Sequence, residues 1–120
     1  MPRISHYKDS QHYTTRDGSE IRELMHPLQH GNQKQSLAEA IVKPEQTTLL
    51  HLHPHTEELY FITQGEGRLR LGDDTHILHQ GDCACIPPNT PHQITNIGQN
   101  DLKILCCCSP AYSHDDTILL

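Results

Sequence analysis

The chain has 120 residues, of which 34% are hydrophobic, with no Trp and a single Phe. That length fits one compact domain, whose core must be built mainly from Leu, Ile, Val, Ala and Cys. The net charge of −6 at pH 7, with Lys and Arg scattered singly, disfavours nucleic acid and anionic membranes as partners. No apolar stretch approaches the roughly 18 residues of a membrane span, and the polar start lacks the apolar run of a signal peptide. We therefore expect a soluble cytoplasmic protein.

Residues 1–20 are polar, contain the turn pair Asp17-Gly18, and are predicted to form a loosely held N-terminal arm before a single domain at 21–120. No segment keeps hydrophobic residues at helical spacing for three turns, so no substantial helix is expected. Short β-type runs separated by turn residues recur instead, at 21–25, 37–42, 47–53, 58–63, 67–71, 75–78, 83–86, 92–96 and 102–108. Strands at this spacing, without helices between them, predict an all-β antiparallel sandwich or barrel.

Alternation along these strands sorts their side chains into two faces. In the run 47–53, Leu49 shares one face with the histidines, and the opposite face is apolar as well. The side chains of this run and the next that need a cover are Leu50, Leu52, Leu59 and Phe61. We expect the early strands within 21–42 to supply this cover, from the same chain or from a second copy, which makes a homodimer the preferred state.

Five cysteines lie on two of the predicted strands. They are Cys83, Cys85, Cys106, Cys107 and Cys108. Neighbours in a strand point to opposite faces and cannot easily bridge each other, so we interpret these residues mostly as buried thiols that act as small apolar side chains. A thiolate metal site is the weaker alternative, because the C-x2-C spacing of zinc knuckles is missing.

Histidine is unusually frequent, with eleven residues, but only three have the spacing of a metal site. His51 and His53 alternate on one strand face, so both imidazoles can reach one ion. Glu58 opens the next strand, and the rigid turn at 87–91 delivers His92. Three neutral imidazoles and one carboxylate suit a single divalent Fe, Mn, Ni, Cu or Zn ion and leave two octahedral positions open.

Two nearby residues compete for these roles. Glu57 is the rival of Glu58, but alternation places it on the opposite side of the strand. His55 is the rival of His51 or His53, but it follows Pro54 in a turn, which favours a position at the rim or surface.

The arrangement of these residues resembles the cupin superfamily, whose two motifs are G-x5-H-x-H-x(3,4)-E-x6-G and G-x5-P-x-G-x2-H-x3-N. The matching residues are His51, His53, Glu58 and Gly65 in the first motif, and Gly81, Pro87, His92 and Asn96 in the second. Glu45 and Asn89 stand where the motifs have Gly; neither position is a metal ligand, and Asn tolerates positive φ. The resemblance covers roughly residues 40–110 and implies a cupin-type double-stranded β-helix, or jelly-roll barrel, around one metal.

Alternation also predicts the surroundings of the metal. Tyr60 and Ile62 share the face of Glu58, and Ile94 and Asn96 share the face of His92. Tyr60 is the candidate catalytic residue, as a proton donor or as a group that orients a substrate oxygen, although a structural role is the alternative. Resemblance to the closing segment of small cupins places Tyr112 at the pocket border, with a packed structural tyrosine as the alternative.

Three functions remain open, because the fold hosts many. The first choice is a dioxygenase that acts on a small organic substrate, since Leu49, Ile62 and Ile94 predict an apolar pocket. The second is Lewis-acid chemistry on a small carbonyl compound, as in an isomerase, decarboxylase or cyclase. The third is a non-catalytic module that binds a small ligand. The expected partners are thus a small molecule and a second copy of the chain.

Overall fold

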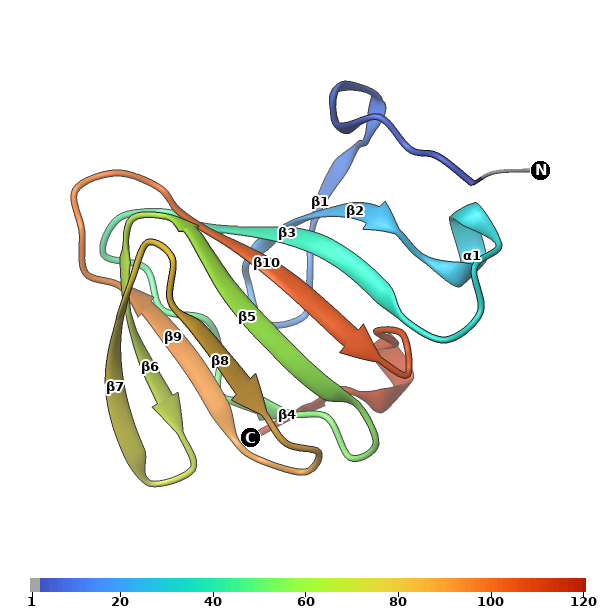
Figure 1. Cartoon of the computed structure of the whole chain (residues 1–120). Helices are drawn as coiled ribbons and strands as arrows, with labels where there is room; N and C mark the ends of the chain where they lie inside the picture. Colours follow the sequence, from blue (N-terminus) through green and yellow to red (C-terminus); the bar gives the residue numbers. More distant parts are fainter. Residues whose placement is uncertain (1–2) are drawn as a thin grey trace.

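The computed structural model describes residues 3–120 and consists of two antiparallel β-sheets (Figure 1). The six-stranded sheet runs in the order β1 (His12–Thr14), β2 (Glu20–Met25), β3 (Ser36–Val42), β10 (Leu102–Ser109), β5 (Glu57–Gln64) and β8 (Cys83–Ile86). The five-stranded sheet runs in the order β11 (Ile118–Leu119), β4 (His51–Leu52), β9 (His92–Asn96), β6 (Glu66–Leu71) and β7 (Asp74–His79). From β4 onward the chain passes repeatedly between the two sheets, and the predicted all-β jelly-roll barrel is confirmed.

The helices of residues 3–120 are short: η1 (Tyr7–Asp9), α1 (Pro27–His30) and η2 (His114–Asp116). Pro27 opens α1, where its missing N–H costs nothing, and the imidazole of His26 accepts a hydrogen bond from the Leu28 N–H. None of these helices has the length and hydropathy that a bilayer span requires. The prediction that no substantial helix forms is therefore confirmed for the described residues.

All nine predicted strands are present, and eight of them lie within one residue of the predicted bounds. The exception is the run 47–53, which is a strand only at His51–Leu52. Before that point the backbone N–H of Leu49 donates to the carbonyl of Asp17, in the turn between β1 and β2, at 2.7 Å. Regular alternation therefore starts only at His51, and Leu49 is 52% exposed rather than on the histidine face.

The core lies between the two sheets and is built from their inward side chains. Its buried members include Ile62, Leu69, Ile94, Leu102 and Ile104. Asn96 is buried as well, and its amide donates to the carbonyls of Val42 and Asn100, both at 2.8 Å. Asn96 therefore holds the loop before β10 and does not belong to a metal site.

Within the chain, the early strands do not cover the outer face of the six-stranded sheet. Leu59 and Phe61 on β5 are 38% and 40% exposed. The early strands β2 and β3 do not lie over them, because β3 pairs with β10 and β2 pairs with β3, so both extend the sheet sideways. The cysteines divide between the two faces of the sheet: Cys106 and Cys108 are buried, whereas Cys83 and Cys85 are exposed on β8. The prediction of buried thiols therefore holds for Cys106 and Cys108 but not for Cys83 and Cys85.

Part of the N-terminal segment, predicted to form a loosely held arm, is paired with the six-stranded sheet. Residues 1–2 lie outside the described part of the chain, but β1 within this segment pairs with β2 along three residues. The predicted boundary at 20/21 falls inside β2. The turn between the two strands, at residues 15–19, therefore has a fixed position at the edge of the barrel.

Candidate metal centre

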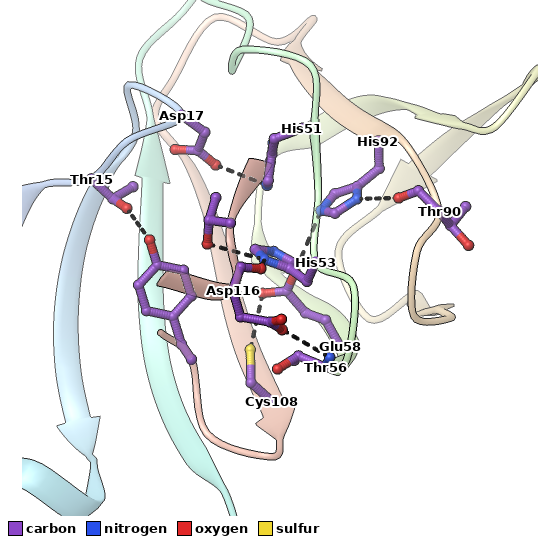
Figure 2. Close-up of polar contacts among 12 residues, drawn as sticks. Thr15, Asp17, His51, His53, Thr56, Glu58, Thr90, His92, Cys108 and Asp116 are labelled. Atoms are coloured by element: carbon purple, nitrogen blue, oxygen red, sulfur yellow. Dashed lines mark hydrogen bonds and ion pairs between the residues drawn. The ribbon is translucent and has the colours of Figure 1, made fainter. Parts of the chain in front are cut away.

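The topology brings the four predicted ligands together at one end of the barrel (Figure 2). His51 on β4 lies directly opposite His92 on the neighbouring β9. His53 follows immediately after β4, and Glu58 projects from β5 in the other sheet. All four side chains are buried, and His92 has no exposed surface at all.

The donor atoms of these residues lie at distances that suit one shared ion. One ring nitrogen of each of His51, His53 and His92 lies within 4.8 Å of those of the other two. The Glu58 Oε1 atom is 3.4 Å from His53 Nε2 and 3.5 Å from His92 Nε2. Two donors that bind one metal at about 2.1 Å in tetrahedral geometry lie about 3.4 Å apart. The Glu58 distances therefore match those of neighbouring ligands.

Backbone carbonyls fix the orientation of all three imidazoles. The Nδ1 atom of His51 lies 2.7 Å from the Leu49 carbonyl, and that of His92 lies 2.9 Å from the Thr90 carbonyl. The Nδ1 atom of His53 lies 3.2 Å from the Asp116 carbonyl. A carbonyl can only accept, so Nδ1 carries the proton in each ring and the Nε2 lone pair is free.

Two of the buried atoms at this point have no hydrogen-bond partner among the described residues. They are Glu58 Oε1 and His92 Nε2, which face each other at 3.5 Å. Both are acceptors in the state just described, and leaving buried acceptors unpaired is costly. A divalent cation between them would remove this cost, so the residues present fit a metal.

Electrostatics keeps the carboxylate charged. Burial alone would raise the pKa of Glu58, but when the Nε2 atoms of His53 and His92 carry a proton, their hydrogen bonds and positive charge outweigh burial and lower that pKa to about 2. Burial, assisted by His92, lowers the pKa of His51. Burial also acts to lower the pKa of His53, but the neighbouring Glu58 carboxylate outweighs it and raises that pKa. Glu58 is therefore an anion at neutral pH.

The rival residues lie outside this cluster. Glu57 is exposed on the other side of β5. The His55 side chain is 82% exposed, and its Nδ1 atom lies 2.7 Å from the Asp116 carboxylate. The predicted rim position of His55 is therefore confirmed.

Sequence reasoning missed several residues that surround the ligands. Cys108 Sγ donates to Glu58 Oε2 at 3.3 Å, so the thiol holds the second carboxylate oxygen. Thr117 Oγ1 lies 3.2 Å from His53 Nδ1. Asp17 Oδ2 lies 3.7 Å from His51 Nε2. The turn pair at Asp17 was a visible signal, but nothing in the sequence placed that turn against His51.

Three residues of the cluster, His51, His53 and Glu58, line a cavity of about 40 Å³ between the sheets. Tyr60, Ile94 and Tyr112 line it, as the sequence predicts. Tyr60 is buried, and its ring stands edge-on to His92 with a centroid distance of 6.1 Å. Two of the predicted apolar pocket residues do not line the cavity: Leu49 is half exposed to solvent, and Ile62 is buried in the core away from it.

A two-sheet antiparallel barrel with inward histidines and a carboxylate at one end of its cavity defines a class of small metal-binding β-barrel proteins. The family model of the cupin domain matches residues 38–108. The chain therefore belongs to the cupin family, and the resemblance inferred from the two motifs is confirmed.

Curated proteins of similar sequence span most of the chain. An uncharacterized protein of Methanocaldococcus jannaschii, MJ1618, is 53% identical over 90% of this chain and 86% of its own length. Protein SchB of Streptomyces halstedii is 28% identical over 84% of this chain and 73% of its own length. The polyketide synthase CurC of Streptomyces cyaneus is 26% identical over 91% of this chain and 70% of its own length.

Solved structures share the fold at lower identity. The polyketide cyclase RemF from Streptomyces resistomycificus superimposes with a TM-score of 0.78 at 23% identity, over 91% of this chain and 80% of its own. The Streptomyces nucleoside dehydratase Pac13 superimposes with a TM-score of 0.79 at 13% identity, over 100% of this chain and 92% of its own. An oxalate decarboxylase from Lactobacillus farciminis superimposes with a TM-score of 0.82 at 25% identity, over 96% of this chain but only 35% of its own.

Proposed function

We propose that this cupin is an enzyme that binds one divalent transition metal through His51, His53, Glu58 and His92 and acts as a Lewis-acid catalyst on a small carbonyl compound. The observation that carries the proposal is that two buried acceptors without a hydrogen-bond partner among the described residues, Glu58 Oε1 and His92 Nε2, face each other beside oriented imidazoles. Fe, Mn, Ni, Cu and Zn all suit this ligand set.

The named activities of the similar proteins favour this reaction class. RemF is a cyclase, Pac13 is a dehydratase, and the Lactobacillus protein is a decarboxylase. None of these three names describes oxygen chemistry, so we place the dioxygenase, the first choice from sequence alone, behind the Lewis-acid alternative. Ligand binding without turnover remains the third candidate.

A bound divalent cation polarises a carbonyl oxygen and stabilises the negative charge that develops on it. The side chains of the protein would position the substrate and donate a hydrogen bond to it. Burial, with a smaller contribution from the Glu58 charge, raises the pKa of Tyr60 well above its usual value, so its hydroxyl stays protonated. We propose that Tyr60 donates a hydrogen bond to a substrate oxygen, while Ile94 and Ile104 keep that part of the cavity apolar.

Metal analysis of protein purified without a nickel-binding tag tests the metal site. We expect close to one first-row metal per chain in the parent and a substantial loss in His92→Ala. His76→Ala is the matched control, because His76 is exposed on β7, in the sheet that carries His51 and His92. Equal metal content in the parent and His92→Ala would refute the site.

The reaction class has a separate test. With a panel of small carbonyl compounds, we expect solvent hydrogen to exchange into a substrate without oxygen uptake. Oxygen consumption that depends on the bound metal would instead restore the dioxygenase. Binding of a panel compound without turnover, with each metal, would favour the binding module.

We also propose that the protein is a homodimer that packs through the outer face of its six-stranded sheet. This face carries apolar side chains on four strands, namely Leu37, Ile41, Leu59, Phe61, Cys83, Cys85, Leu105 and Cys107. Glu39 lies on the same face of β3, where it is buried and accepts a hydrogen bond from the Tyr7 hydroxyl. Glu57 flanks one end of the face and Lys103 the other. A second copy related by a two-fold axis across the strands brings each Glu57 towards the partner's Lys103, so the face is self-complementary.

Equilibrium sedimentation tests this interface. We expect the mass of two subunits at micromolar concentration in the parent and of one subunit in Phe61→Glu, which places a charge in the middle of the face. Arg68→Glu, on β6 of the other sheet, is the control. A parent that sediments as a single subunit would remove the dimer.

A further inference from the structure

The cavity has an acidic wall that the metal ligands do not explain. Besides Glu58, the side chains of Asp17 and Glu23 line it, and both come from the N-terminal hairpin of β1 and β2. No Lys or Arg is among the lining residues of the described chain.

Asp17 is held in place and keeps one oxygen free. Its Oδ1 atom accepts from the backbone N–H of Ser19 at 2.9 Å and from the Ser19 hydroxyl at 2.6 Å. Its carbonyl accepts from the Leu49 N–H at 2.7 Å, which ties the turn to the segment before β4. The other oxygen, Oδ2, lies 3.7 Å from His51 Nε2 (Figure 2). It is therefore available to a molecule bound beside the metal.

Glu23 offers a second free acceptor deeper along the same wall. It is 6% exposed, and its Oε1 atom has no hydrogen-bond partner among the described residues. The nearest ring nitrogen, His26 Nε2, is 4.0 Å from Oε2 and is shared with the Tyr112 carbonyl at 2.8 Å. Burial raises the pKa of Glu23, as expected for a carboxyl group that lacks a donor. A ligand that donates a hydrogen bond would satisfy it.

The charges of the cavity decide which ligands it accepts. A divalent ion with three neutral imidazoles and Glu58 has a net charge of about +1, and the Asp17 carboxylate cancels it. Glu23 then opposes a further negative charge, and none of the described residues that line the cavity supplies a guanidinium or ammonium group to pair with one. Asp17 Oδ2 and Glu23 Oε1 can instead accept hydrogen bonds from a ligand, and leaving the buried Oε1 atom, which has no partner among the described residues, without a donor is costly.

We propose that the cavity selects small neutral or cationic hydrogen-bond donors, such as hydroxyl, amide or amine compounds, against carboxylates and phosphates, and that Asp17 and Glu23 determine this specificity. The volume of about 40 Å³ limits the bound part to a few heavy atoms. The inference rests on the proposed function, because it assigns the substrate class of the same metal site.

Acetamide and acetate are a suitable pair of probes, because they share one shape but differ in charge and in the ability to donate. Each is titrated into the cobalt(II)-loaded protein, and the dissociation constant is taken from the change in the visible absorption of cobalt. The ratio of the two constants cancels effects on the metal that both probes share. Asp17→Asn keeps the acceptor that the turn needs, so it preserves the local fold.

We expect Asp17→Asn to shift the ratio about tenfold in favour of acetate, since a full charge is removed within a few ångströms of the probe. Glu23→Gln shifts it in the same direction. Glu57→Gln removes an exposed carboxylate outside the cavity and leaves the ratio unchanged. Ratios that stay the same in both cavity variants would overturn the inference alone. A parent that takes up no cobalt would overturn the proposed metal site together with it.

Discussion

The replacement of Glu58 by Gln gives the sharpest test of the ligand set, because the two side chains have the same shape and differ in charge. In the parent, Glu58 Oε1 points at the Nε2 atoms of His53 and His92, at 3.4 and 3.5 Å. A ligand that binds only the folded state stabilises it by about 2.7 kcal/mol when its free concentration is 100 times the dissociation constant. Loss of the carboxylate ligand is expected to weaken metal binding at least 100-fold, which reduces this stabilisation to about 0.4 kcal/mol.

These free energies correspond to measurable shifts in melting temperature. An unfolding entropy of about 2.1 cal/mol/K per residue gives about 0.25 kcal/mol/K for a chain of this length. Metal is therefore expected to raise the midpoint by about 11 °C in the parent but by less than 2 °C in Glu58→Gln. The assay is thermal unfolding followed by circular dichroism, with chelator-treated protein as the reference for each variant.

The control is Glu57→Gln, one residue away on the same strand but exposed on its outer side. It should keep the full shift of the parent. A full shift in Glu58→Gln would show that Glu58 is not a ligand, and loss of the shift in Glu57→Gln instead would reverse the assignment between the two residues.

Substitutions at three further positions test the surrounding structure. Glu45→Gly is expected to raise the free energy of unfolding in chemical denaturation by about 0.5–1 kcal/mol, because Glu45 has φ of 68°, a strained value for any residue with a Cβ. Gly67→Ala should lower it by about 1–3 kcal/mol in the same assay, since the added Cβ would lie 2.8 Å from Ile94 Cδ1. Cys108→Ala removes the donor to Glu58 Oε2 and should weaken metal binding about tenfold by competition titration, whereas Cys108→Ser should restore most of it; equal affinities would contradict that role.

The sequence predicted those parts of the fold that repeat along the chain. The motif spacing and the turn at 87–91 indicated His92. Alternation separated Glu58 from Glu57 and placed Ile94 on the face of His92, because β5 and β9 are regular strands with many paired residues. It failed at Leu49, where the backbone bonds to the Asp17 turn and to β9 rather than to a regular ladder. A pattern of period two describes a side chain only where the backbone is a strand.

Features that depend on contacts between distant and irregular segments left no such pattern. The strands β1 and β11 have three and two residues, too few for a periodic signal. The position of Asp17 beside His51 depends on the pairing of β1 with β2 and on one backbone hydrogen bond to Leu49. Composition indicated a turn at Asp17-Gly18 but held no information about what that turn would contact.

The backbone conformation at Glu45 and Asn89 explains why the site tolerates residues other than glycine at these two motif positions. Glu45 and Asn89 are the residues other than glycine that have positive φ in the described chain, at 68° and 62°. Both positions therefore have the left-handed conformation that glycine adopts without strain, although neither residue is glycine. At Asn89 this conformation also serves the site, because its N–H donates to the His53 carbonyl at 2.7 Å and the next carbonyl, of Thr90, orients His92. One turn thus connects the two motifs through backbone atoms, which any side chain compatible with that φ leaves intact.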